Sequence, residues 1–407
     1  MSIPTFDAAK LAAIPDKLAT LYLDDGRLSG FSMLVARQGE IETLACRGKS
    51  AMGAEADAAF DIAPDSIFRI YSMTKPITSL AFMQLIEAGE IGMHDPVTNY
   101  IPAFADTEVW VDGTTRDYTT RPPERDITLH DLITHQSGLT YDFMADHPVD
   151  ALYRRKRLTG SRNAGISLAT FVDELAQLPL LFSPGTSWNY SVGIDVIGRV
   201  IEIVSGMDLE HYFQQHIFTP LGMSDTSFNI TPEQTPRLTH CYYNDSLHGK
   251  IRAIDGSTDT AFLKPTEFYG GGGGLLSTIT DYHRFCRMLE QKGALDGTRI
   301  ISAPMVDEMM RNQLSHGGEL EGFARGSFSE NGFAGNGFGI GGSLILDPAR
   351  ALVPAAVGTY SWGGLANTYF WIDPPNALTV ILMTQMMPYG CYPIRSEVQD
   401  MVYKALA

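Results

Sequence analysis

Residues 68–76 read Phe-Arg-Ile-Tyr-Ser-Met-Thr-Lys-Pro, and an apolar run, 77–86, follows them directly. This pattern predicts a short strand that leads into a helix, with Ser72 and Lys75 in the first helical turn. Residues three apart on a helix lie on one face, so the hydroxyl and the ammonium are expected to share the same space. Unpaired backbone N–H groups and the positive end of the helix dipole lie there too. The stretch therefore suggests a serine nucleophile whose proton a lysine can hold.

The S-x-x-K pattern is weak by itself, because it occurs by chance in many chains of 407 residues. Its surroundings make it stronger. The helix that follows is apolar almost all round, which is typical of a helix buried in a core. A lysine at the start of such a helix is unusual unless it has a function, since charged groups are rarely buried without a partner.

The composition is that of a globular protein, with 44% hydrophobic and 19% charged residues. A net charge of −17 argues against binding to nucleic acid or to an anionic membrane surface. Residues 1–10 show no basic segment followed by an apolar one, and no run of about 18 apolar residues occurs. We therefore expect no signal peptide and no membrane span, and the cytoplasm is the expected compartment.

Motifs for several other chemistries are absent, among them G-x-S-x-G and H-E-x-x-H. His130 and His135 are five residues apart, which does not place both on one helix face, so we expect structural hydrogen bonds rather than a metal site. The glycine run 270–274 lacks a following G-K-[ST] and is expected to let backbone pass close to backbone or ligand. No metal and no cofactor are expected. The four cysteines are scattered and are expected to be free: Cys46, Cys241, Cys286 and Cys391.

Strand-like segments lie at both ends of the chain, and helical segments lie between them. Near the N-terminus, 31–36 and 41–46 read as two strands joined by the turn Gln38-Gly39-Glu40. Residues 92–126 are rich in Pro, Asp and Thr and are predicted to be irregular. Near the C-terminus four strands and a final helix are predicted: 338–346, 355–359, 369–372, 378–383 and 393–406.

This order predicts an α+β fold, in which an antiparallel sheet flanked by helices is joined to a mostly helical lobe. Residues 1–75 and 270–407 are expected to form the domain with the sheet. Residues 76–269 are expected to form the helical lobe, and the active site is expected in a cleft between the two.

Three stretches occur in the order Ser72-Met73-Thr74-Lys75, Tyr190-Ser191-Val192 and Trp362-Gly363-Gly364. Their order and spacing resemble the active-site boxes of class C β-lactamases and serine D-Ala-D-Ala peptidases. The W-G-G form of the third box resembles the family VIII carboxylesterases, which share that fold. The resemblance extends over about residues 20–390 and includes four supporting stretches: 132–139, 182–185, 220–223 and 273–278.

The resemblance implies a role for each matched residue. Ser72 would be the acylated nucleophile, Lys75 would shuttle its proton, and Tyr190 would be the base. A tyrosine ordinarily ionises near pH 10, so as a base it needs a neighbouring cation, which Lys75 can supply. The oxyanion hole would consist of the N–H groups of Ser72 and Leu365, and one such donor is typically worth about 3–4 kcal/mol in the transition state. Without the resemblance, Tyr190 would be taken as a buried core aromatic.

Four further residues are candidates for substrate binding: Val192, Trp362, Gly363 and Gly364. Trp362 is equally compatible with core packing and with a wall of the pocket. Two of these residues depart from the lactamase pattern, which has asparagine at the position of Val192 and lysine at that of Trp362. Losing a cation opposite a buried carboxylate removes a charge-assisted hydrogen bond of roughly 1.5–3 kcal/mol. Both changes favour neutral esters over anionic amides.

The leading hypothesis is a serine esterase acting on small, short-acyl esters through an acyl-enzyme. A β-lactamase or D-Ala-D-Ala peptidase-like hydrolase, or an acyltransferase, using the same residues is the alternative. A non-catalytic binding protein on this scaffold is disfavoured, because Ser72, Lys75 and Tyr190 are all present. The expected partner is a small-molecule ester, with neither nucleic acid nor a membrane.

Overall fold

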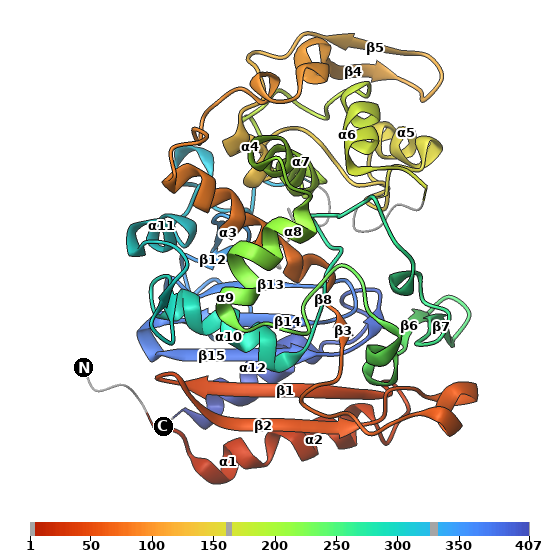
Figure 1. The fold of residues 1–407 in the computed structure, drawn as a ribbon, viewed down its shortest axis with the longest axis vertical. Helices are drawn as coiled ribbons and strands as arrows, with labels where there is room; N and C mark the ends of the chain where they lie inside the picture. The colour runs from red at the N-terminus through yellow and green to blue at the C-terminus, as the bar shows by residue number, and fades with distance from the viewer. Residues whose placement is uncertain (1–4, 160–164, 326–332, 407) are drawn as a thin grey trace.

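A seven-stranded antiparallel sheet built from both ends of the chain is the centre of the fold (Figure 1). The computed structural model describes residues 5–159, 165–325 and 333–406. The strand order is β11-β12-β13-β14-β15-β1-β2, so an early strand, β1, pairs with a late one, β15. The strands are β1 (Gly30–Arg37), β2 (Glu40–Gly48), β11 (Asn336–Phe338), β12 (Ser343–Ile345), β13 (Tyr360–Gly363), β14 (Tyr369–Asp373) and β15 (Leu378–Met383).

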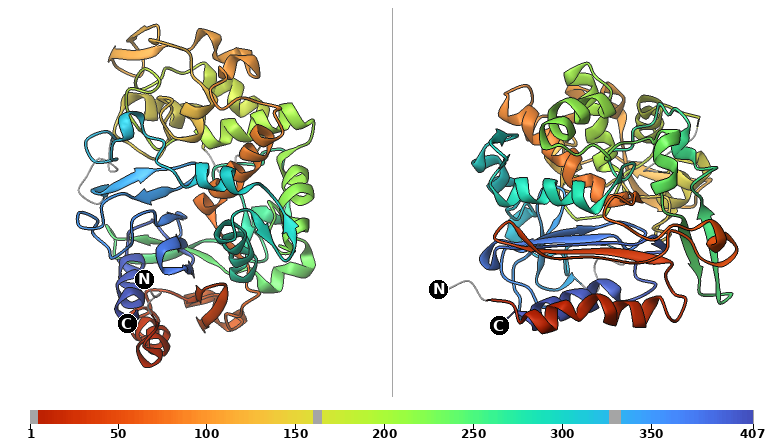
Figure 2. Two further views of the ribbon diagram at one scale, coloured as in Figure 1. Left: turned by 90° about the vertical axis from the view of Figure 1, so that its left-hand side faces the viewer. Right: turned by 60° about the horizontal axis from the view of Figure 1, so that its bottom comes forward.

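Helices cover both faces of this sheet. The first two helices and the last, α1 (Ala8–Ala12), α2 (Ile14–Tyr22) and α12 (Ile394–Ala405), lie against one face (Figure 2). Side chains alternate along a strand, so Met33 and Val35 pack with these helices. Leu34 and Ala36 belong to the main core on the opposite face. A helix from the second half of the chain, α10 (Ile279–Glu290), packs against β15 on that opposite face.

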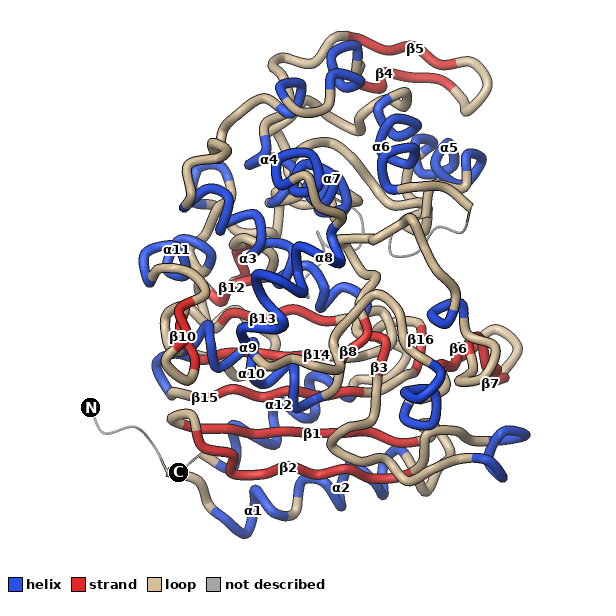
Figure 3. The backbone as a smooth tube through the Cα atoms, in the orientation of Figure 1, coloured by secondary structure: helices blue, strands red, loops and turns tan. Residues whose placement is uncertain are grey.

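The middle of the chain forms a mostly helical lobe, drawn above the sheet in Figure 3. Its helices are α4 (Leu129–Ile133), α5 (Pro148–Lys156), α6 (Leu168–Ala176), α7 (Gly193–Ser205) and α8 (Leu209–Phe213). Helix α7 ends at Gly206, whose φ of 69° is the left-handed conformation that glycine adopts most easily. Thr128 and Asp131 form a capping box that begins α4.

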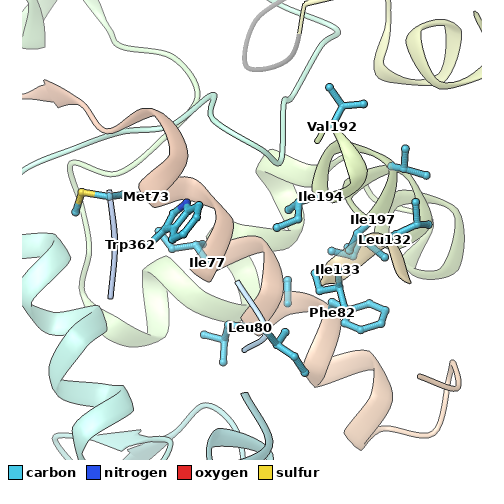
Figure 4. Close-up of a cluster of buried hydrophobic side chains, with 14 of the residues drawn as sticks. Met73, Ile77, Leu80, Phe82, Leu132, Ile133, Val192, Ile194, Ile197 and Trp362 are labelled. Atoms are coloured by element: carbon cyan, nitrogen blue, oxygen red, sulfur yellow. The ribbon is translucent and has the colours of Figure 1, made fainter. Parts of the chain in front are cut away.

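Helix α3 (Thr74–Glu87) runs between the lobe and the sheet and contacts both. It is buried almost all round, as predicted, and its apolar residues form the middle of the main core. In Figure 4, Ile77 lies beside Trp362 of the sheet, and Phe82 lies near Ile133 of α4. The residues that precede α3 are therefore held between two packed layers.

Smaller elements tie the two parts together. Strand β3 (Phe68–Arg69) pairs with β8 (Leu276–Ser277), and β6 (Cys241–Asp245) pairs with both β7 (Lys250–Asp255) and β16 (Met386–Met387). Segment 241–255 thus lies within the predicted helical lobe by sequence but pairs with a strand from the C-terminal part. Other short elements are α9 (Thr219–Leu221), α11 (Ala303–Met309), β9 (Ala294–Leu295) and β10 (Thr298–Arg299).

Three sequence predictions of local structure were wrong. The predicted strand 338–346 is interrupted: it contains the last residue of β11, a turn over 339–342, and β12. Residues 355–359 are not a strand; β13 begins at Tyr360, where pairing with Ile372 of β14 starts. The segment 92–126, predicted to be irregular, contains a hairpin of β4 (Val109–Gly113) and β5 (Tyr118–Arg121).

Two other expectations are met in the described part of the chain. All four cysteines are free. Within that part, the helices are too short or too polar to cross a membrane.

Candidate active site

Ser72 lies in a 3-10 turn, Tyr71–Met73, immediately before α3. The helix begins at Thr74, so Ser72 is one turn earlier than predicted; a 3-10 turn repeats every three residues, which keeps Ser72 and Lys75 on one side. Tyr71 has a φ of 45°, a strained value for a residue with a side chain. Such strain is typical of active sites, where the surrounding structure holds it in place.

Lys75 is completely buried, and its ammonium donates three hydrogen bonds. Its Nζ donates to Ser72 Oγ at 3.2 Å, to the Tyr141 hydroxyl at 2.9 Å and to the Gly272 carbonyl at 2.5 Å. An ammonium has three protons, and each has an acceptor here. The ammonium is therefore held in one position next to a half-buried serine.

Tyr190 completes the group around the serine. Its hydroxyl donates to Ser72 Oγ at 2.6 Å, and Lys75 Nζ lies 4.7 Å from its ring centre. The side chain is only 6% exposed. The structure thus brings together all three residues that the sequence predicted to be catalytic, and both partners of Ser72 are more deeply buried than Ser72 itself.

Tyr141 is a member of the site that the sequence analysis did not find. Its hydroxyl accepts from Lys75, and its ring lies 5.1 Å from that of Tyr190. Burial, and then the neighbouring Tyr190 and Asp195, raise the pKa of Tyr141 well above its usual value. Tyr141 therefore remains a neutral phenol. Its position two residues after the matched stretch 132–139 is the signal that was available.

His135 packs edge-on against Tyr190, with ring centres 4.9 Å apart. Its Nδ1 lies 3.2 Å from Ser191 Oγ. Burial, followed by the charge of Lys75, lowers the pKa of His135 well below its usual value, so the imidazole is neutral. His130 pairs separately with Gln313 at 3.2 Å. Both histidines thus have the structural hydrogen bonds predicted for them, and the described residues contain no group of side chains arranged as metal ligands.

The glycine run 270–274 passes close to the site, as predicted. A Cβ on Gly272 would lie 2.5 Å from Asp195 Oδ2 and 3.0 Å from the Tyr141 hydroxyl. The Gly272 N–H donates to Asp195 Oδ1 at 2.9 Å, while its carbonyl accepts from Lys75. Asp195 is completely buried in the first turn of α7, where the helix dipole favours a negative charge.

The third box lies at the end of β13. Trp362 is 8% exposed and packs against Tyr190 and Phe338, with ring centres 5.5 Å and 5.3 Å away. It therefore belongs to the core and also forms a wall beside Tyr190. A Cβ on Gly364 would lie 2.3 Å from the Ile70 carbonyl, so this glycine lets the turn approach the segment that contains Ser72.

Leu365 follows Gly364 in this turn and is half-buried. The oxyanion role of its N–H, and of the Ser72 N–H, stays a prediction. Val192 lies at the N-terminus of α7 and is completely buried in the main core. In Figure 4 its side chain is well separated from Trp362, so a direct contact with substrate also stays a prediction.

A model of the β-lactamase family matches residues 15–396, nearly the whole chain. The chain belongs to the β-lactamase family. The predicted β-lactamase/transpeptidase-like fold is thereby confirmed, and the S-x-x-K, Tyr190 and W-G-G stretches all lie inside the matched region.

Named relatives of this chain include esterases. The chain is 30% identical to the esterase EstB of Burkholderia gladioli, over 98% of this chain and 97% of that protein. It is also 30% identical to a lovastatin esterase of Penicillium rubens, over 77% and 78% of the two chains. Among solved structures it resembles EstCE1, described as a hydrolase with promiscuous acyltransferase activity, with a TM-score of 0.79 and 26% identity over 97% and 99% of the two chains.

Proposed function

We propose that this protein is a serine esterase that hydrolyses small, neutral, short-acyl carboxylic esters through an acyl-enzyme on Ser72. The observation that carries this proposal is the convergence of Tyr190 and Lys75 on Ser72 Oγ, at 2.6 Å and 3.2 Å. The esterase names of two relatives, one of them matched over nearly its full length, support the reaction class. Family VIII, whose third box also reads W-G-G, is the group of carboxylesterases to which we assign it.

In acylation, Tyr190 as phenolate takes the proton of Ser72, and Oγ forms a bond to the ester carbonyl carbon. The negative charge moves to the carbonyl oxygen, which the N–H groups of Ser72 and Leu365 would stabilise. When the tetrahedral intermediate collapses, the ester C–O bond breaks and Tyr190 returns its proton to the leaving alcohol. Lys75 keeps a positive charge near Tyr190, which favours the phenolate, and can help to shuttle the proton between Ser72 and Tyr190.

Deacylation repeats these steps with water as the nucleophile. Tyr190 takes a proton from the water, whose oxygen attacks the acyl carbon, and the proton then returns to Ser72 as the acid leaves. If an alcohol takes the place of water, the same residues perform acyl transfer. The promiscuous acyltransferase activity described for EstCE1 favours that second activity.

The substrate class follows from two residues of the boxes. Val192 and Trp362 stand where the lactamase pattern has an amide and a cation, so a β-lactam carboxylate lacks its usual partner. A neutral ester needs neither group. A β-lactamase or a D-Ala-D-Ala peptidase is therefore the weaker candidate.

The experiment is a side-by-side rate measurement on p-nitrophenyl butyrate and nitrocefin, with the wild type, Ser72→Ala and Tyr190→Phe. The ester should be turned over much faster than nitrocefin, and only when Ser72 is present. Tyr190→Phe should lose about 10²- to 10⁴-fold, the usual contribution of a positioned base. Undiminished ester turnover by Ser72→Ala would refute the proposal, and faster nitrocefin turnover would favour the lactamase alternative.

A further inference from the structure

Arg395 is a cation at the third box that none of the sequence motifs includes. It lies in the first turn of α12, and its Nη2 donates to the carbonyl of Gly364. The guanidinium carbon lies 5.3 Å from the ring centre of Tyr369 and 4.4 Å from that of Tyr389. Its Nε is buried without a hydrogen-bond partner in the described part of the chain. A cation in such surroundings is unfavourable unless the site uses it.

Gly363 of the third box explains how this arginine reaches the turn. A Cβ at residue 363 would lie 2.5 Å from the guanidinium carbon of Arg395. Any side chain there would push the guanidinium away from the next carbonyl. The first glycine of the W-G-G box thus leaves room for Arg395. The second leaves room for the carbonyl of Ile70, which lies two residues before Ser72.

The carbonyl of Gly364 and the N–H of Leu365 belong to one peptide group. Peptide groups are planar and, in the described residues, every bond except Met387–Pro388 is trans. In a trans peptide the C=O and the N–H point in opposite directions. The Gly364 carbonyl is held by Arg395 and by the Asn367 N–H at 3.1 Å. Fixing that carbonyl fixes the direction of the Leu365 N–H, which points away from Arg395.

We propose that Arg395 is a positioning residue that orients and polarises the Gly364–Leu365 peptide, so that the Leu365 N–H serves as an oxyanion donor. This inference rests on the proposed acyl-enzyme mechanism. A charged donor on the carbonyl draws electron density from the peptide and makes its N–H a stronger donor. The group is therefore oriented before the reaction, which is the condition for electrostatic stabilisation of a transition state.

The test compares Arg395→Met, Arg395→Lys and Gly363→Ala with the wild type, and Arg47→Met, an exposed arginine paired with Asp16, is the matched control. Each variant is assayed on neutral p-nitrophenyl butyrate and on an ester with a carboxylate in its acyl group, p-nitrophenyl hemisuccinate. Inhibition by an alkyl trifluoromethyl ketone, which forms an oxyanion adduct on a serine, is measured in parallel. Circular dichroism confirms that each variant is folded.

Arg395→Met should lose roughly 10- to 100-fold in kcat on both esters, with KM nearly unchanged, a smaller loss than removal of a donor itself. Affinity for the trifluoromethyl ketone should fall by the same factor. Gly363→Ala should reproduce this pattern with the arginine still present, and Arg395→Lys should recover part of the activity. Arg47→Met should match the wild type.

Three outcomes would overturn the proposal. One is unchanged kcat in both Arg395→Met and Gly363→Ala. Another is a loss confined to the KM for the hemisuccinate, which would make Arg395 a receptor for a substrate carboxylate. The third is a fall in kcat without a fall in ketone affinity. Failure of the esterase proposal itself is distinct, because it appears as a wild type inactive on both esters, while the ketone comparison still reports on Arg395.

Discussion

Lys75 and Asp195 are connected through a single residue, because the Gly272 carbonyl accepts from the lysine at 2.5 Å and the Gly272 N–H donates to the carboxylate at 2.9 Å. Both side chains are completely buried. The ammonium that lies beside Tyr190 is therefore linked to a buried carboxyl group carried on a different helix.

Replacing the carboxylate should reduce turnover. Asp195→Asn keeps an oxygen that can accept from Gly272 but removes the charge. We expect a loss of at least about tenfold in kcat, because a buried ammonium is less favourable without nearby negative charge. Steady-state turnover of p-nitrophenyl butyrate measures the loss. Glu202→Gln, on the same helix and paired with Arg199, is the control and should leave kcat unchanged.

Removing the hydroxyl of Tyr141 should slow the reaction without stopping it. Tyr141→Phe takes one of three acceptors from Lys75, and a hydrogen bond to a charged group is worth about 1.5–3 kcal/mol. The expected loss in kcat is roughly 10- to 100-fold, smaller than for Tyr190→Phe. Labelling of Ser72 by a fluorophosphonate should slow in parallel. The buried Tyr212 of α8 provides the control, Tyr212→Phe, and equal rates in the two variants would contradict the assignment.

The absence of a side chain at Gly272 should be essential for activity. In Gly272→Ala the new methyl would lie 2.5 Å from Asp195 and 3.0 Å from the Tyr141 hydroxyl, so the lysine's acceptors must move. A shift of about 1 Å in a catalytic group can reduce the rate about 100-fold. Gly318→Ala is the matched control, because its Cβ would lie 3.7 Å from the nearest neighbouring atom, the carbonyl oxygen of Ser315. Steady-state kcat and thermal unfolding of both variants separate a loss of activity from a loss of fold.

Stability should fall in mild acid because of His283. This side chain is 6% exposed on α10, and burial, followed by the charges of Arg287 and Arg284, lowers its pKa to about 4. In an unfolded chain histidine titrates near about 6.5. Between these values the unfolded state binds more protons, so stability is lost as the pH falls through that window. From pH 7 to pH 5 this one group should reduce the free energy of unfolding by about 2 kcal/mol.

Urea unfolding of the wild type and His283→Gln at the two pH values checks this expectation. The difference between pH 7 and pH 5 should shrink by about 2 kcal/mol in the variant. His248→Asn, which removes an exposed histidine, should behave like the wild type. An unchanged difference in His283→Gln would show that burial does not hold this imidazole neutral.

Local signals in the sequence predicted much of the fold. Gln38 and Gly39 form the predicted turn of the first hairpin, with φ values of 52° and 83°, and α12 covers 394–405 where a helix was predicted over 393–406. The sequence failed at 355–359, because strand identity there depends on pairing between Tyr360 and Ile372. The start of β13 is set by its partner strand, and residues 355–359 themselves carry no pattern that marks it.

The residues of the site also fall into two groups: those that a sequence motif predicts and those that only the fold brings together. Ser72, Lys75 and Tyr190 were predicted to share a site because their spacing and order resemble known boxes, and the structure does bring them together. Tyr141 and Asp195 were missed, since each acts through a contact with a residue far away in the chain. A lone tyrosine or aspartate carries no pattern of its own, and its function depends on what the fold places beside it.

The pairing of β1 with β15, which aligns Ser32 with Met383, also has a consequence for synthesis. The segment that bears the nucleophile leaves the ribosome early, whereas the third box and the strand that completes the sheet emerge near the end. Contacts between such distant segments form slowly, because a long loop must close first. The protein is thus expected to acquire activity only after nearly the entire chain has been made, and no shorter nascent chain should cleave an ester.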